Sequence, residues 1–147
     1  MYDWEKGRDV VARHHNINVL KGLTVNSVEK STSREVIISS LYPKTVDALV
    51  FHTSCGKEFV MYHDQECCEN VFLEDVCGNL DDLVGKPITM AECAKSNNFN
   101  DELLESETWT FYKLATIKGY VTLRWYGASN GYYSESVDFI EVIPKGV

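Results

Sequence analysis

Short apolar runs and period-two alternation dominate the chain after about residue 20, and they predict strands rather than helices. Eight segments have this pattern: 24–29, 46–53, 58–62, 71–77, 88–93, 108–116, 120–126 and 136–143. Two connections between them, 54–57 and 117–119, contain Gly56 and Gly119, which suit tight hairpin turns. The pattern therefore predicts a domain built mainly of antiparallel sheet.

Two other segments favour short helices. Asn79 can cap a helix whose first turn holds Asp81 and Asp82, and Gly85 followed by Pro87 ends it. Near the N-terminus, one face of a short helix is suggested by the spacing of Val10, Val11, His14 and Ile17. We therefore expect an α+β fold, with an N-terminal extension over residues 1–18 and a single domain over 19–147.

A shift of the chain by 63 positions partly matches it to itself without a gap. Leu20 and Gly22 fall on Leu83 and Gly85, and further matches follow at Val25 with Ile88, Phe51 with Leu114, Gly56 with Gly119, Tyr62 with Trp125 and Asp75 with Asp138. Identities are few, so both a true duplication and a shared hairpin pattern explain them. A duplication would divide the chain into two strand–hairpin–strand units, 20–82 and 83–145.

Charge and cysteine content narrow the classes of function. The net charge of −8 disfavours a general nucleic-acid binder, because phosphates would be repelled, and it suits either simple solubility or a basic partner. No apolar run is long enough to span a membrane, and the first residues do not resemble a secretory signal. The five cysteines are therefore expected as free thiols in the cytoplasm.

The segment 62–70 concentrates one imidazole, three carboxylates and two thiols, namely His63, Asp64, Glu66, Cys67, Cys68 and Glu69. Such side chains could bind zinc, although no zinc-finger spacing is present. They could also form a thiol nucleophile, with His63 as base and Asp64 orienting the ring, although the carboxylates would raise the thiol pKa. The favoured interpretation is a capped loop whose cysteines pack as small apolar residues, so we expect no metal and no cofactor.

The segment 125–135 is the second unusual stretch. Its glycines and the Asn130-Gly131 pair predict a β-hairpin with aromatic cross-strand pairs. The same aromatics, Tyr126, Tyr132 and Tyr133, would also suit a recognition loop. A third stretch, 95–107, is rich in Asn, Asp and Glu and is expected to be an exposed acidic loop.

From about residue 20 to 139 the chain resembles a family of small phage and bacterial proteins that carry a domain of unknown function. The resemblance depends on the segments 61–65, 67–69, 74–75, 80–83, 109–116, 125–127 and 130–135 taken together. It implies a phage or prophage setting, hence the cytoplasm of an infected bacterial host. The family supplies no established activity or site residues to carry over.

No phosphate loop, dinucleotide-binding glycine pattern, zinc-protease helix or nucleophile elbow is present. We therefore expect a non-enzymatic accessory protein that binds and inhibits a host protein with a basic surface, such as a defence component. The alternatives are a protein that sequesters a small molecule or nucleotide signal, and a metal- or thiol-dependent enzyme using 63–69. A homodimer is also expected, with no contact to nucleic acid or membrane. The expected binding residues are His63, Asp64, Glu69, Tyr126, Asn130, Tyr132, Tyr133 and Glu135.

Overall fold

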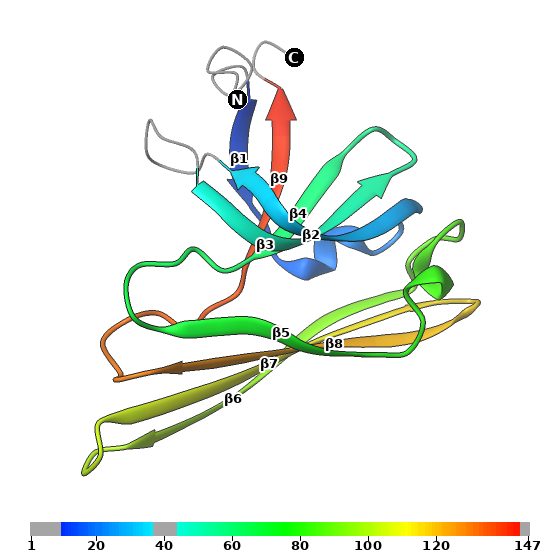
Figure 1. Ribbon diagram of the computed structural model, residues 1–147. Coiled ribbons are helices and arrows are strands. Elements are labelled where there is room, and N and C mark those ends of the chain that lie inside the picture. Colours follow the sequence, from blue (N-terminus) through cyan, green and yellow to red (C-terminus); the bar gives the residue numbers. More distant parts are fainter. Residues whose placement is uncertain (1–9, 37–43, 145–147) are drawn as a thin grey trace.

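A computed structural model describes residues 10–36 and 44–144 of the chain and shows two antiparallel sheets that pack face to face (Figure 1). The elements are β1 (Val10–His14), η1 (Ile17–Leu20), β2 (Val25–Val36), β3 (Lys44–Thr53), β4 (Glu58–Tyr62), β5 (Asn70–Cys77), η2 (Leu80–Leu83), β6 (Met90–Asn100), β7 (Glu105–Thr116), β8 (Gly119–Ser129) and β9 (Asp138–Pro144). Both η elements are single turns of 3-10 helix. No helix of the described residues is long and apolar enough to cross a membrane.

The first sheet has five strands in the order β1-β9-β4-β3-β2, and the second has four in the order β5-β8-β7-β6. The prediction of mainly antiparallel sheet is confirmed, and all eight predicted strands are present. The expectation of an α+β fold is wrong, because among the described residues the only helices are the two 3-10 turns. The helix expected near Asn79–Val84 is η2, which is too short for an α-helical hydrogen-bond ladder.

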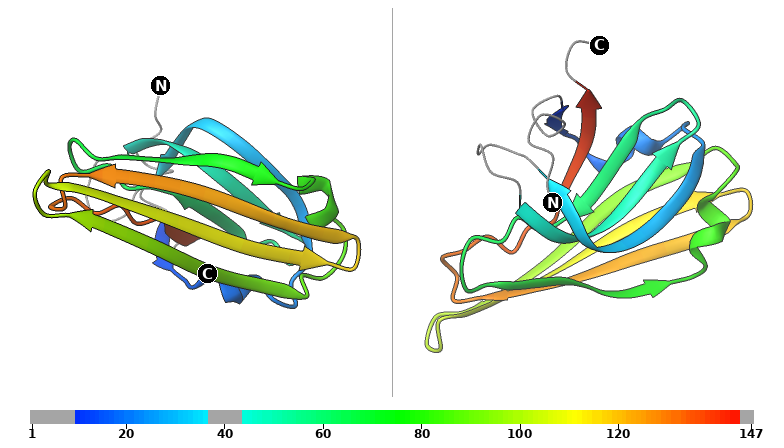
Figure 2. Two further views of the ribbon diagram at one scale, coloured as in Figure 1. Left: turned by 90° about the horizontal axis from the view of Figure 1, so that it is seen from below. Right: turned by 45° about the horizontal axis from the view of Figure 1, so that its top comes forward.

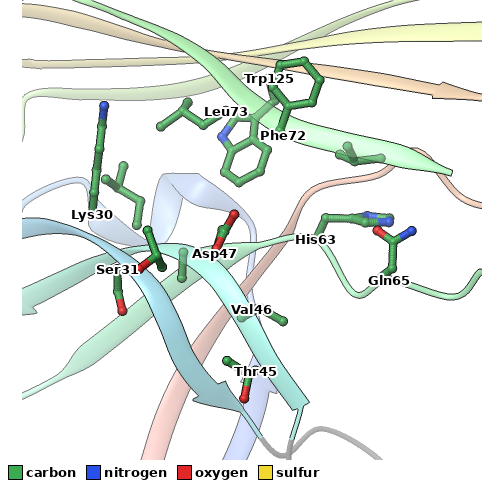
Figure 3. A pocket seen from close by; sticks show the side chains of 14 residues that line it. Lys30, Ser31, Thr45, Val46, Asp47, His63, Gln65, Phe72, Leu73 and Trp125 are labelled. Atoms are coloured by element: carbon green, nitrogen blue, oxygen red, sulfur yellow. The ribbon is translucent and has the colours of Figure 1, made fainter.

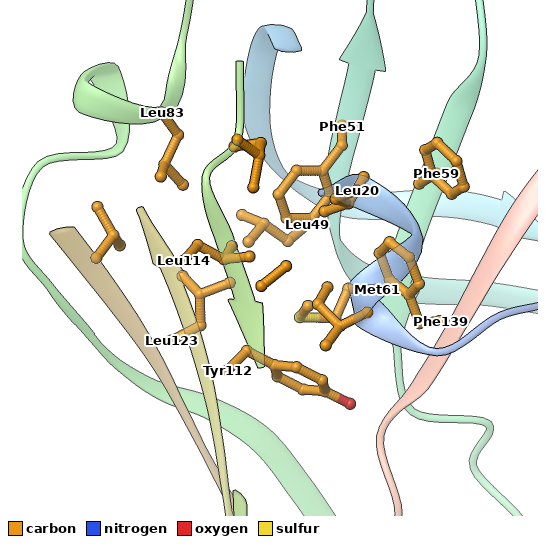
Figure 4. Close-up of a cluster of buried hydrophobic side chains, with 14 of the residues drawn as sticks. Leu20, Leu49, Phe51, Phe59, Met61, Leu83, Tyr112, Leu114, Leu123 and Phe139 are labelled. Atoms are coloured by element: carbon orange, nitrogen blue, oxygen red, sulfur yellow. The ribbon is translucent and has the colours of Figure 1, made fainter. Parts of the chain in front are cut away.

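The main core lies between the two sheets (Figure 4). Alternate residues of β7 and β8 point inward, so that Leu114, Val121 and Leu123 have no exposed surface. They meet Leu49, Phe51, Phe59 and Met61 of the five-stranded sheet. A second, smaller cluster lies on the opposite face of the five-stranded sheet and includes Val50, Val60, Tyr62 and Ile140.

The elements recur in the same order twice, as a 3-10 turn followed by four strands. The turn η2 begins 63 positions after η1, and β6, β7, β8 and β9 follow it as β2, β3, β4 and β5 follow η1. The last strand of each set joins the other sheet, because β5 pairs with β8 and β9 pairs with β4. This exchange ties the two sheets together.

The correspondence extends to individual hydrogen bonds. Asn16 and Asn79 cap η1 and η2 through the same side-chain contact, each accepting from the backbone N–H two residues later. The backbone N–H of Gly22 donates to the carbonyl oxygen of Ile88, and that of Gly85 donates to the carbonyl oxygen of Val25. Because Gly22 matches Gly85 and Val25 matches Ile88 under the shift of 63 positions, the two hydrogen bonds are equivalent. Gly22 and Gly85 also share positive φ angles of 90° and 87°. A duplicated unit would produce this arrangement, and the duplication itself stays a prediction.

Three local expectations are wrong. Of the N-terminal residues whose spacing suggested a helix, Val10, Val11 and His14 lie in β1, a strand paired with β9, and Ile17 begins the 3-10 turn η1. The stretch expected as an acidic loop over 95–107 forms the far end of a long hairpin, in which β6 and β7 are joined by a turn at 101–104. The Asn130-Gly131 turn does not close a hairpin, because β8 and β9 lie in different sheets. Residues 1–9 of the expected N-terminal extension lie outside the described residues.

Candidate functional site

The two unusual stretches lie side by side, because each connects one sheet to the other. Residues 63–69 lead from β4 to β5, and residues 130–137 lead from β8 to β9. His63 Nδ1 lies 2.7 Å from the carbonyl oxygen of Ser136 in the second loop, and the backbone N–H of Asp64 donates to the side chain of Asp138, the first residue of β9. The two loops therefore lie against each other.

The side chains of His63 and Glu69 form a buried ion pair between these loops, with 4% and 0% of their surface exposed. His63 Nε2 lies 2.9 Å from Glu69 Oε2, and its other ring nitrogen faces the Ser136 carbonyl. Both ring nitrogens of His63 are thus engaged with oxygen atoms of the protein. The arrangement leaves neither ring nitrogen to act as a base for a thiol.

The carboxylate of Glu69 also organises its own loop. It accepts hydrogen bonds from the backbone N–H groups of Glu66 and Cys67, both at 2.8 Å, and from the side chain of Gln65. Burial by itself raises the pKa of Glu69, but these backbone bonds and the contact with His63 outweigh burial and lower the pKa to about 2. The carboxylate is therefore charged at neutral pH and fixes the loop conformation.

The cysteines differ in part from the expectation of five free thiols. The Sγ atoms of Cys67 and Cys68 are joined in a disulfide, whereas Cys55, Cys77 and Cys93 are free. The hydrogen bond from Thr53 lowers the pKa of Cys55, the hydrogen bond with Asp75 raises that of Cys77, and burial raises that of Cys93. Within the described part of the chain, no group of three or more His, Cys, Asp and Glu side chains is arranged to hold a metal ion.

Glu135 is a second buried carboxylate, and hydroxyl groups surround it. Ser106 and Thr108 of β7 donate to its Oε1 atom, and Ser129 of β8 donates to Oε2. The space around it is tight, because a Cβ atom on Gly127 would lie 2.9 Å from the Cβ of Glu135. Glu135 therefore holds the 130–137 loop against the sheet from within.

Of the other binding residues expected in this loop, Asn130 and Tyr132 are exposed and Tyr133 is half-buried. Asn130 closes a turn by accepting from the backbone N–H of Tyr132 at 2.9 Å. The rings of Tyr132 and Tyr133 pack edge to face, with centroids 5.0 Å apart, and 83% of Tyr132 is exposed. These two tyrosines contact each other and stand apart from Tyr126.

Tyr126 belongs to a different surface, the outward face of the four-stranded sheet. Residues directly opposite each other in the register share a face, and one such row runs from Phe72 through Tyr126 and Trp109 to Ser96. The ring centroids of Phe72 and Tyr126 lie 5.8 Å apart, and those of Trp109 and Tyr126 lie 4.7 Å apart. We call the surface formed by Phe72, Trp109, Phe111, Arg124 and Tyr126 the aromatic face.

Arg124 crosses this face and links it to acidic side chains. Its guanidinium carbon lies 5.7 Å from the centroid of the Trp109 ring, and its nitrogens contact Glu74 and Asp75. Tyr126 donates a 3.0 Å hydrogen bond to Glu107, and burial followed by this bond raises the pKa of Tyr126. Among the described residues no element covers the face, which is seen from below in the left panel of Figure 2.

Tyr126 was predicted from the sequence as a binding residue, whereas Phe72, Trp109, Phe111 and Arg124 were not. The pattern of residues in β7 could have indicated this surface from the sequence. In β7 each of the two alternating sets contains aromatic or apolar side chains, with Tyr112 and Leu114 buried and Trp109 and Phe111 only half-buried. Aromatic side chains on the uncovered face of a strand form a surface that suits a partner.

These features define a class: a two-sheet β-protein with one buried interface and one open, aromatic sheet face. The chain belongs to the family described as Domain of unknown function (DUF7448), which matches residues 18–139. This match confirms the resemblance to a domain of unknown function. No curated protein and no solved structure matches the chain significantly.

Proposed function

We propose that the protein is a non-enzymatic binding protein that captures a partner protein with a basic surface on its aromatic face. The observation that carries the proposal is the uncovered row of Phe72, Tyr126 and Trp109 across three neighbouring strands. Aromatic side chains dominate the centres of protein interfaces, because they bury a large area at little cost in conformational entropy. A face of this kind on a rigid sheet needs no rearrangement to bind.

Charge indicates the chemistry of the partner. Five carboxylates lie on or beside the aromatic face, against the two cations Arg124 and Lys113: Glu74, Asp75, Glu92, Glu105 and Glu107. The whole chain carries a net charge of −8. Guanidinium groups of a partner would stack on Trp109 and Tyr126 and pair with these carboxylates. A nucleic-acid backbone would be repelled.

In the phage setting that the resemblance implies, the partner would be a protein of the bacterial host. By binding the basic surface of this host protein, the phage protein would block the host protein's activity in the cytoplasm. We propose a defence component as the kind of target. Basic surfaces of such targets commonly engage nucleic acid through lysine and arginine side chains. An acidic protein that covers such a surface would compete with the nucleic acid.

The contacts support this proposal more than the alternatives. A nucleotide-stacking platform built from the 126–133 tyrosines is not favoured, since Tyr126 lies on the sheet face whereas Tyr132 and Tyr133 pack on each other in the loop. An enzyme using 63–69 is not favoured either, since His63 and Glu69 are buried and bonded to each other.

The test is capture from bacterial lysate with the immobilised protein, followed by titration of each captured protein in purified form. We expect a protein with a basic surface to bind the wild type and to lose at least about tenfold in affinity with Trp109→Ala or Tyr126→Ala. Ile117→Ala is the matched control, because Ile117 is 84% exposed at the β7–β8 turn, away from the aromatic face. Equal binding by all four proteins would refute the proposal.

A further inference from the structure

A cleft of about 420 Å³ opens between the two sheets where β3 and the start of β5 diverge (Figure 3). One wall comes from the four-stranded sheet and is apolar, formed by Val71, Leu73 and Trp125. The other wall comes from β2 and β3 and carries Lys30, Thr45, Asp47 and Leu49. The volume is in the range of clefts that bind small molecules.

Two of the polar side chains that line this cleft, Lys30 and Asp47, carry opposite charges. Lys30 lies opposite Leu49 in the β2–β3 register, and Asp47 is the next residue on the same face of β3. Both side chains are exposed, no ion pair within 4.0 Å joins them, and among the described residues neither side chain forms a hydrogen bond or ion pair. A cation and a carboxylate that stand near each other at an apolar wall, without bonding to each other, can each bind a group of a ligand.

A second cleft, formed by the second set of elements from η2 to β9, offers a comparison that supports this interpretation. It lies under the β6–β7 hairpin and is lined by Lys95, Thr108, Ser134 and Glu135, among others. Thr108 matches Thr45 of the first cleft under the shift of 63 positions, and Glu135 matches Phe72. In the second cleft Glu135 takes hydrogen bonds from Ser106, Thr108 and Ser129, so its polar groups satisfy one another. The first cleft has no such internal network around its charges.

We propose that the cleft between Lys30, Asp47, Leu73 and Trp125 binds a small zwitterion with an apolar side group, of the class of an apolar amino acid or a short apolar peptide. The ligand carboxylate pairs with Lys30, its ammonium group pairs with Asp47, and its apolar group packs against Leu73 and Trp125. A nucleotide fits less well, because Asp47 would repel its phosphate. This site shares Phe72 with the aromatic face, but it lies between the sheets and does not depend on the function proposed for that face.

The test is a titration of the full chain with L-phenylalanine and with the dipeptide Phe-Phe, followed by NMR of the Trp125 indole. We expect a saturable shift at Trp125 and none at Trp109. The dipeptide distinguishes the two sources of the ligand: tighter binding of Phe-Phe indicates a peptide, and tighter binding of phenylalanine indicates a free amino acid. N-acetylphenylalanine lacks the ammonium group and phenylalaninamide lacks the carboxylate, and each should bind about tenfold to hundredfold more weakly than phenylalanine.

Two variants test whether Lys30 and Asp47 bind the charged groups of the ligand. Lys30→Met and Asp47→Asn should each weaken phenylalanine binding about tenfold or more, while Lys57→Met, at an exposed lysine of the β3–β4 turn, should leave it unchanged. The comparison of phenylalanine with its two blocked forms uses only the wild type, so the test stands even if a variant does not fold. The proposal is overturned by the absence of a saturable Trp125 shift, by equal binding of the blocked forms, or by preferential binding of adenosine monophosphate.

Discussion

His63 Nε2 lies 2.9 Å from Glu69 Oε2 in a pair that is almost completely buried, at the point where the chain passes from one sheet to the other. The pair fixes the 63–69 loop, and through the Ser136 carbonyl it also contacts the 130–137 loop. Both loops begin or end strands of the four-stranded sheet. The pair therefore supports the strand ends beside the aromatic face without being exposed to a partner itself.

Replacing Glu69 by Gln tests this structural role. The substitution keeps the size of the side chain but removes the buried charged acceptor that contacts His63 and two backbone N–H groups, so we expect a loss of about 1.5–3 kcal/mol in the free energy of unfolding. Urea denaturation followed by circular dichroism measures it. Glu66→Gln is the control, because Glu66 is exposed in the same loop, and it should change stability by less than about 0.5 kcal/mol. Equal stability of the two variants would show that the pair contributes nothing.

Acid should destabilise the fold through Glu69. Its pKa is lowered from 4.5 to about 2 in the folded protein, so the folded state binds the proton less readily than the unfolded chain. The stabilisation by Glu69 is therefore fully present above about pH 4.5 and is lost as the pH falls towards 2. The stability difference between wild type and Glu69→Gln, measured by urea denaturation at several pH values, should shrink over this interval. A difference that stays constant down to pH 2 would contradict the assignment.

Glu135→Ala should also destabilise the protein, by about 2–3 kcal/mol, because the hydroxyl groups of Ser106, Thr108 and Ser129 would lose their common acceptor. Thermal unfolding measures the change. Glu102→Ala in the exposed β6–β7 turn is the matched control and should unfold at the wild-type temperature. If Glu135→Ala instead keeps full stability, Glu135 would be available to a ligand rather than to the fold.

We expect the protein to form a homodimer through a sheet edge. The outer edge of β6 has no strand partner among the described residues, and β6 is exposed along most of its eleven residues. Pairing with a second β6 across a two-fold axis would satisfy its free backbone groups. Light scattering at micromolar concentration should give twice the mass of 16.7 kDa, and Asn97→Pro on this strand should shift the mass to one chain. A wild-type mass of one chain would exclude the dimer.

The approximate positions of eight of the nine described strands could be predicted from the sequence, because alternation of apolar and polar residues is a local property; β1 was expected as a helix. The arrangement of the strands could not. The Asn130-Gly131 signal correctly marks a turn, but it does not encode that β9 leaves the sheet of β8. Likewise, the 95–107 stretch looks polar because the β6–β7 hairpin is exposed over most of that length, and solvent exposure removes the alternation on which the strand prediction depends.

The candidate site could be predicted only in part for a related reason. The titratable cluster at 63–69 is visible in the sequence, but whether His63 meets Glu69 or a cysteine is decided by the fold of the loop. Tyr126 was predicted as a binding residue because other aromatic residues lie close to it along the chain. Its contacts with Phe72 and Trp109 instead come from adjacent strands, and sequence separation conceals such contacts.

The most direct test of the central claim is the response of the Trp109 indole to basic peptides. In an NMR titration of the full chain with oligoarginine, oligolysine and oligoglutamate, the account predicts a saturable shift of Trp109 with oligoarginine and a weaker one with oligolysine. It predicts no shift with oligoglutamate and none at the buried Trp125 with any peptide. Tyr126→Ala should reduce the oligoarginine affinity about tenfold, while Ile117→Ala should not change it. Shifts confined to other parts of the protein, or an equal response to oligoglutamate, would contradict the assignment of the aromatic face as the partner-binding surface.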